Sequence, residues 1–273
     1  MSAVHPVISI VTVVFNGSRF LAQTLASVAE QDYDPVEHWV IDGGSTDGTL
    51  DIIQEHADQL TGWISEPDIG IADAFNKGLA RATGDYIMFL NADDALAGPT
   101  VLRDVIEHAR KNAWPSVIYG DCDLHDPDSD VILYRAVIHY DRARFLNRET
   151  LPHPGMLMHR RYFERFGQFD TSYRIAMDYE LFLRGVPLVG AVRVPVVVSK
   201  VRAGGVSARA RTQVIDESIR ALKKHGYLMP LDELKVRAAY AVRGAARRAL
   251  EQMGLYRNFD ALRRRGRAVR RHE

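Results

Sequence analysis

The sequence has a single cysteine, no net charge and no apolar run long enough to cross a bilayer. The one cysteine, Cys122, excludes an internal disulfide and suits a reducing compartment; we expect it to be a small buried hydrophobe. The longest apolar candidate, residues 186–198, contains Arg193 and Pro195 and is predicted to be a buried strand. Residues 1–6 lack the charged and apolar sections of a signal peptide. Together these absences predict a cytoplasmic protein.

The lack of net charge hides an asymmetry along the chain. Basic and acidic residues number 35 each, yet residues 235–273 hold twelve basic and three acidic ones, a net charge of +9. This basic C-terminal segment is compatible with an amphipathic helix on anionic lipid headgroups, or with a solvated helix packed on the rest of the protein. A nucleic-acid partner is not expected, because aromatic residues are not interleaved with the arginines.

Strand and helix patterns alternate through the first half of the chain. Nearly continuous apolar runs predict strands over residues 7–14, 38–41, 62–65 and 86–90, with helical spacing between them, for example over residues 71–82. Such alternation implies an α/β fold with a mostly parallel sheet and right-handed crossovers. The alternation fades after residue 120, and after residue 205 the pattern predicts two helices, over residues 212–225 and 231–255. We therefore expect a domain over residues 1–205, with halves 1–120 and 121–205, and a basic helical extension over 206–273.

Acidic residues follow two of the predicted strands, at the ends where ligands bind in open α/β sheets. Asp42 precedes two glycines, and its carboxylate can accept hydrogen bonds from a nucleobase or a ribose hydroxyl. The alternative is a plain strand-to-helix turn with Asp47 as the helix cap. The loop is not a phosphate-binding P-loop, because it lacks the Gly-Lys-Ser/Thr ending.

The second acidic cluster, Asn91-Ala92-Asp93-Asp94, offers hard oxygen ligands at the end of a hydrophobic strand. One or two carboxylates commonly hold Mg²⁺ or Mn²⁺ against a substrate diphosphate, where the ion neutralises the charge of the departing group. In the alternative, the two aspartates only cap the next loop. The metal is favoured, because two adjacent carboxylates without a basic partner are costly to bury.

These clusters belong to a longer series of segments that resembles the inverting family-two glycosyltransferases, which have the GT-A fold. The resemblance extends over roughly residues 6–205. Each segment alone is weak evidence, but the order and spacing of the segments are specific to the family. The matching segments are residues 9–16, 42–49, 65–78, 82–85, 89–94 and 176–181.

The resemblance implies a sugar-nucleotide donor and assigns residues to it. Asn91, Ala92 and Asp93 correspond to the metal-binding DxD-type segment; because Asn replaces the first carboxylate, Asp93 is the expected ligand of Mn²⁺ or Mg²⁺. Lys77 and Arg202 correspond to diphosphate contacts, with a solvated lysine and a surface arginine as the alternatives. The remaining donor-side positions are Thr12, Val14, Asn16 and Asp42 around the base and ribose, and Asp68 and Asn76 on the floor of the site.

The resemblance also implies a catalytic base. Inverting transfer needs one carboxylate to take the proton of the acceptor hydroxyl as that oxygen attacks the anomeric carbon. Asp178 matches this position, with a helix-capping role as the alternative, and Glu180 is the reserve candidate. His153 and Asp94 are weaker candidates for the acceptor side.

The sequence therefore predicts a metal-dependent inverting glycosyltransferase that uses a UDP-linked sugar and a hydroxyl acceptor in cell-envelope polysaccharide or glycolipid synthesis. Because many relatives glycosylate lipid-linked acceptors, membrane contact at the inner face of the plasma membrane is favoured for the basic segment. One alternative is a degenerate relative that binds a nucleotide or glycan. Another is a nucleotidyltransferase, which would need a basic, glycine-rich loop where Phe15-Asn16-Gly17 stands. The main hypothesis requires Asp42, Asp93 and Asp178 to share one cleft.

Overall fold

The computed structural model describes residues 5–148 and 150–228. The first compact unit of the chain runs from Met1 to His225, and the second is residues 226–273. Helices α8 (Val206–Arg209) and α9 (Arg211–Lys224) belong to the first unit, so this unit extends past residue 205, where the sequence pattern placed the boundary. The helix predicted over residues 231–255 lies outside the described residues.

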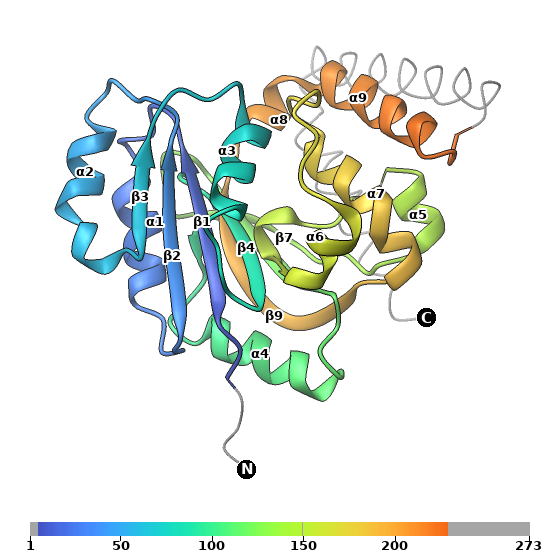
Figure 1. Ribbon diagram of the computed structural model, residues 1–273, viewed down its shortest axis with the longest axis horizontal. Coiled ribbons are helices and arrows are strands. Elements are labelled where there is room, and N and C mark those ends of the chain that lie inside the picture. The colour runs from blue at the N-terminus through green and yellow to red at the C-terminus, as the bar shows by residue number, and fades with distance from the viewer. Residues whose placement is uncertain (1–4, 149, 229–273) are drawn as a thin grey trace. The chain divides into compact units, whose positions relative to one another are not determined.

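A single mixed sheet forms the centre of the first unit (Figure 1). Its strand order is β3-β2-β1-β4-β8-β6-β9-β5, and β7 pairs with β6. The strands are β1 (Ile8–Val14), β2 (Val36–Asp42), β3 (Gly62–Ser65), β4 (Tyr86–Asn91), β5 (Ala95–Leu96), β6 (Val117–His125), β7 (Ile132–Ala136), β8 (Met156–His159) and β9 (Val192–Arg202). The helices before α8 are α1 (Leu21–Ala29), α2 (Thr49–Glu55), α3 (Ile71–Leu79), α4 (Val101–Lys111), α5 (Arg142–Leu146), α6 (Arg160–Phe166) and α7 (Met177–Val189), with short 3₁₀ turns η1 (Ala57–Gln59) and η2 (His153–Gly155).

The strand directions bring many loops to one edge of the sheet. Strands β1 to β4 are mutually parallel, and β8 is antiparallel to both β4 and β6. Strand β6 therefore runs in the direction of β4, and β9 is parallel to β6. The carboxyl ends of β1, β2, β3, β4, β6 and β9 thus lie along one edge, which we call the carboxyl edge. Because β8 enters the sheet there, the turn η2 before it lies at the same edge.

Strand β1 is buried along its whole length because helices cover both faces of the sheet. On one face Ile10 belongs to a core with Val105 of α4. On the other face α3 packs against Val11, and a Cβ atom on Gly78 would lie 2.1 Å from a Val11 methyl group. Only glycine at that position lets the helix approach so closely. This three-layer packing fixes the loops at the carboxyl edge.

The second half of the unit departs more from the sequence pattern. Strand β6 continues to His125, past residue 120 where the alternation of patterns fades, and α6 was not predicted. The prediction of a strand over residues 186–198 was wrong at its start, because the chain is helical to Val189 and extended only from Val192. Within the described ranges, none of the helices combines the length and apolar character needed to cross a membrane.

Candidate functional site

The loops that follow β1 and β2 are joined by hydrogen bonds. The Asn16 amide donates to Ser45 Oγ at 2.8 Å, and Asn16 Oδ1 accepts from the Thr46 amide at 2.9 Å. The Gly17 amide donates to Thr49 Oγ1 at 3.0 Å. Asn16 itself has a φ of 50°, in the left-handed region that asparagine tolerates. Asn16 therefore holds these two loops together at the carboxyl edge.

Asp42 is fully buried at the end of β2. Its carboxylate accepts hydrogen bonds from the Gly44 amide at 3.1 Å, the Ser45 amide at 3.0 Å and Ser65 Oγ at 2.6 Å, and from Ser45 Oγ. These donors come from the loop after β2 and from the end of β3. The carboxylate thus shapes the loop. Asp47, the residue expected to cap α2 in the alternative interpretation, accepts hydrogen bonds from the amide and hydroxyl of Thr49, the first residue of the helix. The cap residue itself is Gly48.

Phe15, Gly43 and Asp68 meet beside this loop. A Cβ atom on Gly43 would lie 2.4 Å from Asp68 Oδ2 and 3.4 Å from a ring carbon of Phe15. The glycine is therefore needed for the approach of Asp68, whose Oδ1 accepts from the Gly70 amide at 2.8 Å. The Phe15 ring is 66% exposed. Phe15 lies within the segment from Thr12 to Asn16 that was expected around the base and ribose, but its ring was given no role of its own, although an aromatic residue directly after a buried strand was a usable signal.

The other predicted donor-side residues of β1 lie inside the sheet. Thr12 is fully buried, and its Oγ1 lies 2.9 Å from Nε2 of His38. Burial lowers the pKa of His38 to about 3, so this pair is neutral. Val14 is buried in a core cluster with Leu21 and Leu25 of α1.

Asn76 and Lys77 on α3 are engaged by other parts of the chain. The Asn76 amide group donates to the Phe169 carbonyl and accepts from the Phe169 amide, both at 2.9 Å. Lys77 Nζ donates to the Pro67 carbonyl at 2.8 Å and lies 3.1 Å from Glu66 Oε1. Desolvation alone would lower the Lys77 pKa, but the carboxylates of Glu66 and Asp73 raise it above its ordinary value. Both side chains thus fix neighbouring loops.

The second acidic cluster is partly desolvated. Asn91 Nδ2 donates to Asp94 Oδ2 at 3.0 Å, and Thr24 Oγ1 of α1 reaches the main-chain carbonyls of Ala92 and Asp94 at 2.8 and 2.7 Å. Burial raises the pKa of Asp93, and burial together with the Asp93 charge raises the pKa of Asp94 to about 8. In the part of the chain that the structure describes, no three His, Cys, Asp or Glu side chains are already arranged to hold a metal ion.

Asp93 and Asp94 line a narrow hollow at the carboxyl edge, which we call the Asp93 hollow. Arg202 at the end of β9 also lines it, with its guanidinium carbon 4.1 Å from the centre of the Phe20 ring and a hydrogen bond to Gln23. The structure thus brings Arg202 to the predicted metal segment. The complete lining is Phe20, Gln23, Thr24, Asp93, Asp94, Ala95, His125, Asp130, Lys200 and Arg202. Sequence reasoning missed His125 and Lys200.

Asp178 is the second residue of α7. Its Oδ1 accepts from the Tyr179 amide at 2.7 Å, and burial raises its pKa to about 6. Glu217 of α9 raises this pKa further by its negative charge. The Glu217 carboxylate also accepts hydrogen bonds from three amides that precede α7, at 2.9 to 3.1 Å: those of Arg174, Ile175 and Ala176. Helix α9 therefore caps the helix that carries the candidate base.

Glu180 has a structural environment. It is fully buried and forms an ion pair with Arg184, while Lys224 Nζ and His225 Nε2 approach its Oε1 to 2.9 and 2.8 Å. Hydrogen bonds from these groups lower the Glu180 pKa against its desolvation. Such a carboxylate stays charged and paired, so it anchors the end of α9 on α7.

His153 in η2 packs against aromatic rings. Its ring centre lies 5.3 Å from that of Phe75 and 6.3 Å from that of Phe89. Burial lowers its pKa to about 4, so the ring is neutral. Its Nε2 is buried without a hydrogen-bond partner among the described residues.

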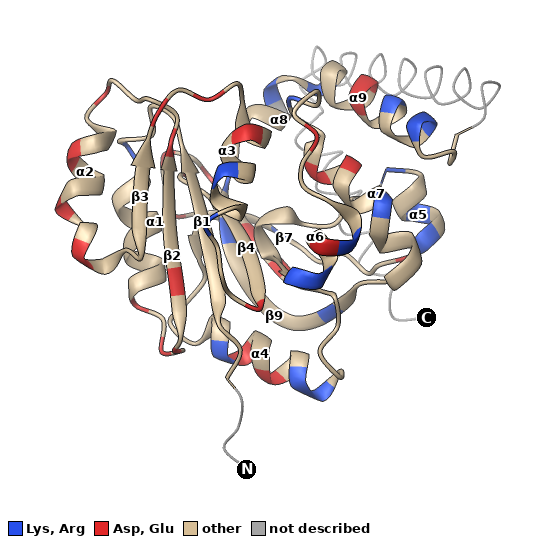
Figure 2. Ribbon diagram, in the orientation of Figure 1, with Lys and Arg blue, Asp and Glu red and all other residues tan. Residues whose placement is uncertain are grey.

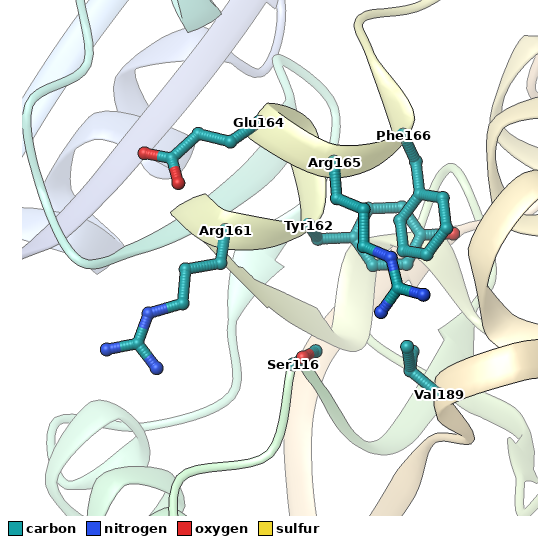
Figure 3. A pocket seen from close by; sticks show the side chains of 7 residues that line it. All are labelled: Ser116, Arg161, Tyr162, Glu164, Arg165, Phe166 and Val189. Carbon is teal, nitrogen blue, oxygen red and sulfur yellow. The ribbon is translucent and has the colours of Figure 1, made fainter.

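Of the three aspartates predicted to share one cleft, only Asp93 lines the Asp93 hollow. The Asp93 hollow includes Arg202 and Asp94, but it is not lined by Asp42 or Asp178. A larger hollow lies near Ser116, at the amino end of β6 and thus opposite the carboxyl edge (Figure 3). It is lined by Ser116, by Val189 of α7 and by residues of α6 that include Arg161 and Arg165, and by none of the predicted site residues. Figure 2 shows acidic residues where β2 and β3 end and in the loops that follow them.

Curated proteins similar to this chain are glycosyltransferases. An uncharacterized glycosyltransferase of Mycobacterium tuberculosis is 28% identical over 237 residues, which are 86% of this chain and 90% of the relative. A PGL/p-HBAD biosynthesis glycosyltransferase of Mycobacterium bovis is 30% identical over 182 residues, 66% of this chain and 69% of the relative.

Solved structures share the fold at low identity. S. aureus TarS 1-349 in complex with UDP matches with a TM-score of 0.63 and 17% identity, over 84% of this chain and 68% of that chain. The mannosyltransferase PcManGT from Pyrobaculum calidifontis in complex with GDP-Man and Mn²⁺ matches with a TM-score of 0.59 and 21% identity, over 95% of this chain and 81% of that chain. The longer TarS chain is covered to 38% of its length. The family model described as Glycosyl transferase family 2 matches residues 9–167, more than half of the chain. The chain therefore belongs to glycosyl transferase family 2 and has the GT-A fold.

Proposed function

We propose that this glycosyltransferase moves a sugar from a UDP-linked donor to a hydroxyl acceptor with inversion at the anomeric carbon. The observation that carries the proposal is the family match over residues 9–167, which includes the loops after β1, β2, β3, β4 and β6 at the carboxyl edge. Two further findings support the donor class: TarS was solved with UDP and with UDP-GlcNAc, and PcManGT with GDP-Man.

The nucleoside end of the donor fits the loops after β1, β2 and β3. The exposed Phe15 ring offers an apolar face to a nucleobase. Asp42 orders the loop that carries Gly43, and Gly43 allows Asp68 to approach that ring. Asn16 supports this end of the donor site by joining the loops after β1 and β2. Asn76 and Lys77 support it by holding the main chain at Phe169 and Pro67. Thr12 and Val14 support this end from inside the sheet.

A divalent cation fits the Asp93 hollow by the chemistry of its donors. Asp93 would be a ligand of Mn²⁺ or Mg²⁺, next to Asp94, and PcManGT binds Mn²⁺. When bound, such an ion neutralises the charge that develops on a departing nucleotide diphosphate. Arg202 on the same hollow offers a guanidinium that is suited to phosphate oxygens. Asn91 holds the Asp94 carboxylate by its hydrogen bond.

Asp178 would act as the base. Inverting transfer forms a bond between the acceptor oxygen and the anomeric carbon while the bond to the diphosphate breaks on the opposite side. The hydroxyl proton then passes to the Asp178 carboxylate. Because burial raises its pKa to about 6, Asp178 is a stronger proton acceptor than an exposed aspartate and is still ionised at neutral pH. The place of α7 is secured by Glu217 and by the Glu180 ion pairs, so Glu180 serves as a support.

The proposed acceptor is a cell-envelope glycan or glycolipid. A relative acts in PGL/p-HBAD biosynthesis, which supports this acceptor class. The basic C-terminal segment would place the enzyme at the inner face of the plasma membrane by binding anionic lipids. Co-sedimentation with anionic liposomes before and after truncation at Leu231 tests this, and equal pelleting of the two forms would remove the membrane role.

The test of the activity combines donor binding and transfer. We would screen nucleotide sugars with Mn²⁺ by thermal shift, and then compare wild type with Asp178→Asn, using the exposed Asp58→Asn as a matched control. The Asp178 variant should bind the donor normally and transfer sugar about 10²–10⁴-fold more slowly. Normal transfer by this variant would remove Asp178 as the base. Donor binding without transfer by wild type would favour the nucleotide-binding alternative.

A further inference from the structure

His125, the last residue of β6, differs from Asp121 and Asp123 on the same strand in its side-chain partners. The residues of β6 and β9 pair regularly here, Asp123 with Lys200 and His125 with Arg202, so these four lie on one face of the sheet. On β6, Asp121 pairs with Arg193 at 2.6 Å.

Asp123 has a partner as well, because Arg135 of β7 binds it through two hydrogen bonds, at 2.7 and 2.8 Å. His125 is only 6% exposed, yet both of its ring nitrogens are buried without a hydrogen-bond partner in the described ranges of the chain. A buried polar group without a partner destabilises the fold, so its presence points to a ligand.

The unpartnered imidazole lies on the same hollow as the acidic cluster. His125, Asp93 and Asp94 all line the Asp93 hollow, although His125 ends β6 and the two aspartates lie in the turn after β4, which is not a neighbour of β6 in the sheet. Carboxylates and a neutral imidazole are the ligand types that divalent transition-metal ions accept together. Two independent features, desolvated carboxylates and an unsatisfied nitrogen ligand, therefore meet at one place.

We propose that His125 supplies a nitrogen ligand to the divalent cation that Asp93 binds, and that Asp94 joins Asp93 as an oxygen ligand. This proposal rests on the metal part of the proposed function and goes beyond it, because it adds a ligand from β6 and a preference among cations. No three such side chains are already arranged around a metal position in the described ranges, so the three groups must close around the ion as it binds.

A nitrogen ligand changes which cation the hollow prefers. Mg²⁺ favours oxygen ligands, whereas affinity of a site with nitrogen and oxygen ligands rises from Mn²⁺ to Co²⁺. The site should therefore select Mn²⁺ and Co²⁺ over Mg²⁺. His125→Gln should weaken Co²⁺ binding most, Mn²⁺ binding at least about tenfold, and Mg²⁺ binding by less than about threefold.

The direct test is pulsed electron paramagnetic resonance of the full chain with Mn²⁺, with and without UDP. Coordinated imidazole gives a nitrogen modulation of the Mn²⁺ echo, and labelling histidine with the heavier nitrogen isotope separates this signal from nitrogen of UDP or of the main chain. Wild type should show the modulation and its isotope shift, and His125→Gln should lose both. His56→Gln on α2, whose Nδ1 already lies 2.9 Å from the Ile52 carbonyl, is the matched control.

The outcomes separate this proposal from the proposed function. One outcome is that wild type binds Mn²⁺ tightly, shows no histidine modulation and loses no affinity on His125→Gln. That result overturns the role of His125 as a ligand but leaves the metal site of the proposed function in place. Weaker UDP binding by the variant without histidine modulation assigns His125 to the diphosphate instead and also overturns it. Loss of Mn²⁺ binding in Asp93→Asn supports Asp93 as the carboxylate ligand. Failure of wild type to bind Mn²⁺ in the presence of UDP overturns both the proposed cation site and the proposed histidine ligand.

A second variant guards against misfolding. His125→Leu removes the unsatisfied nitrogens but keeps a buried side chain of similar size. Without metal, its melting temperature should equal or exceed that of wild type, and the rise on adding Mn²⁺ should be lost. A lower melting temperature without metal and an unchanged rise with Mn²⁺ would contradict the proposal.

Discussion

The loops after β1 to β3 and the helices α7 and α9 hold their buried carboxylates in different ways. Asp42 takes its hydrogen bonds from residues two to 23 positions away, all in the loop after β2 or at the end of β3. Glu217 and Glu180 take theirs largely from residues 41 to 45 positions away. The first arrangement is local and has several donors in one loop. The second joins two helices that are remote in the sequence.

This difference separates a region whose buried carboxylate is held by nearby residues from one whose buried carboxylates join remote parts of the chain. Removing one donor from Asp42 leaves the others in place, whereas removing Glu180 leaves Arg184 and Lys224 without their shared partner. We therefore expect substitutions in the helices to cost more stability than substitutions in the loops. The predictions below test that expectation.

The largest effect is expected for Glu180→Gln. Removing the charge of the buried Glu180 carboxylate leaves Arg184 without its charged partner, while Lys224 keeps its ion pair with Asp170. The loss should be about 3 kcal/mol in the free energy of unfolding at neutral pH. Because the Glu180 pKa is lowered in the folded state, its contribution is present above the ordinary glutamate pKa and is lost as the pH falls through the lowered value. Urea denaturation at about pH 7 and about pH 3 measures this, with the exposed Glu107→Gln as control. A cost that is equal at both pH values would contradict it.

Glu217→Gln should have the next largest effect. The variant loses the charged cap of three amides before α7, at a cost of about 2 kcal/mol. It also removes a negative charge that raises the pKa of Asp178, so the acid limb of the kcat/KM profile should move to lower pH. Glu107→Gln again serves as control. An unchanged acid limb together with the stability loss would mean that Glu217 stabilises the fold but does not influence the pKa of Asp178.

The contrast between the two regions also explains what the sequence could predict. The strands over residues 62–65 and 86–90 and the acidic loops after β2 and β4 follow from periodicity and turn residues, which are local. The pairing of β8 between β4 and β6 joins residues about 40 to 75 positions apart in the chain, and no local pattern encodes it. The helix α6 was missed for a related reason, because its buried side chains, such as Tyr162, pack on the distant helix α7.

The candidate site divides in the same manner. The sequence located Asp42, Asp93 and Asp178 at loop or helix starts, where residue type and position are informative. It could not show that Asn76 binds the Phe169 main chain or that His125 reaches the Asp93 hollow, because both depend on side-chain packing across the fold. The assignments of these residues to donor, cation and base stay predictions.

Asp178→Asn should stabilise the fold at alkaline pH. The folded-state pKa of about 6 lies above the ordinary aspartate value of 3.8, so the folded protein binds this proton more tightly than the unfolded chain. Ionisation therefore destabilises the fold as the pH rises between these values, and a neutral side chain removes that cost. We expect a gain of about 1–2 kcal/mol at about pH 8 and none at about pH 4. Urea denaturation checks it against Asp58→Asn, and an equal change at both pH values would refute the burial of a charged Asp178.

The smallest effect is expected for Ser65→Ala at the end of β3. Ser65 Oγ is one of several donors to Asp42, and the Gly44 and Ser45 amides remain after its removal. The loss should therefore be about 0.5–1 kcal/mol in the free energy of unfolding, with little change in donor affinity. Ser129→Ala, in an exposed turn where the hydroxyl binds Asp126, is the matched control and should change stability less. A loss above about 2 kcal/mol would mean that the hydrogen bonds of Asp42 act as one unit, because the remaining donors would then fail to hold the carboxylate. In that case the loops after β1 to β3 would be as dependent on single contacts as α7 and α9 are, and the difference between the two regions would lie only in sequence distance.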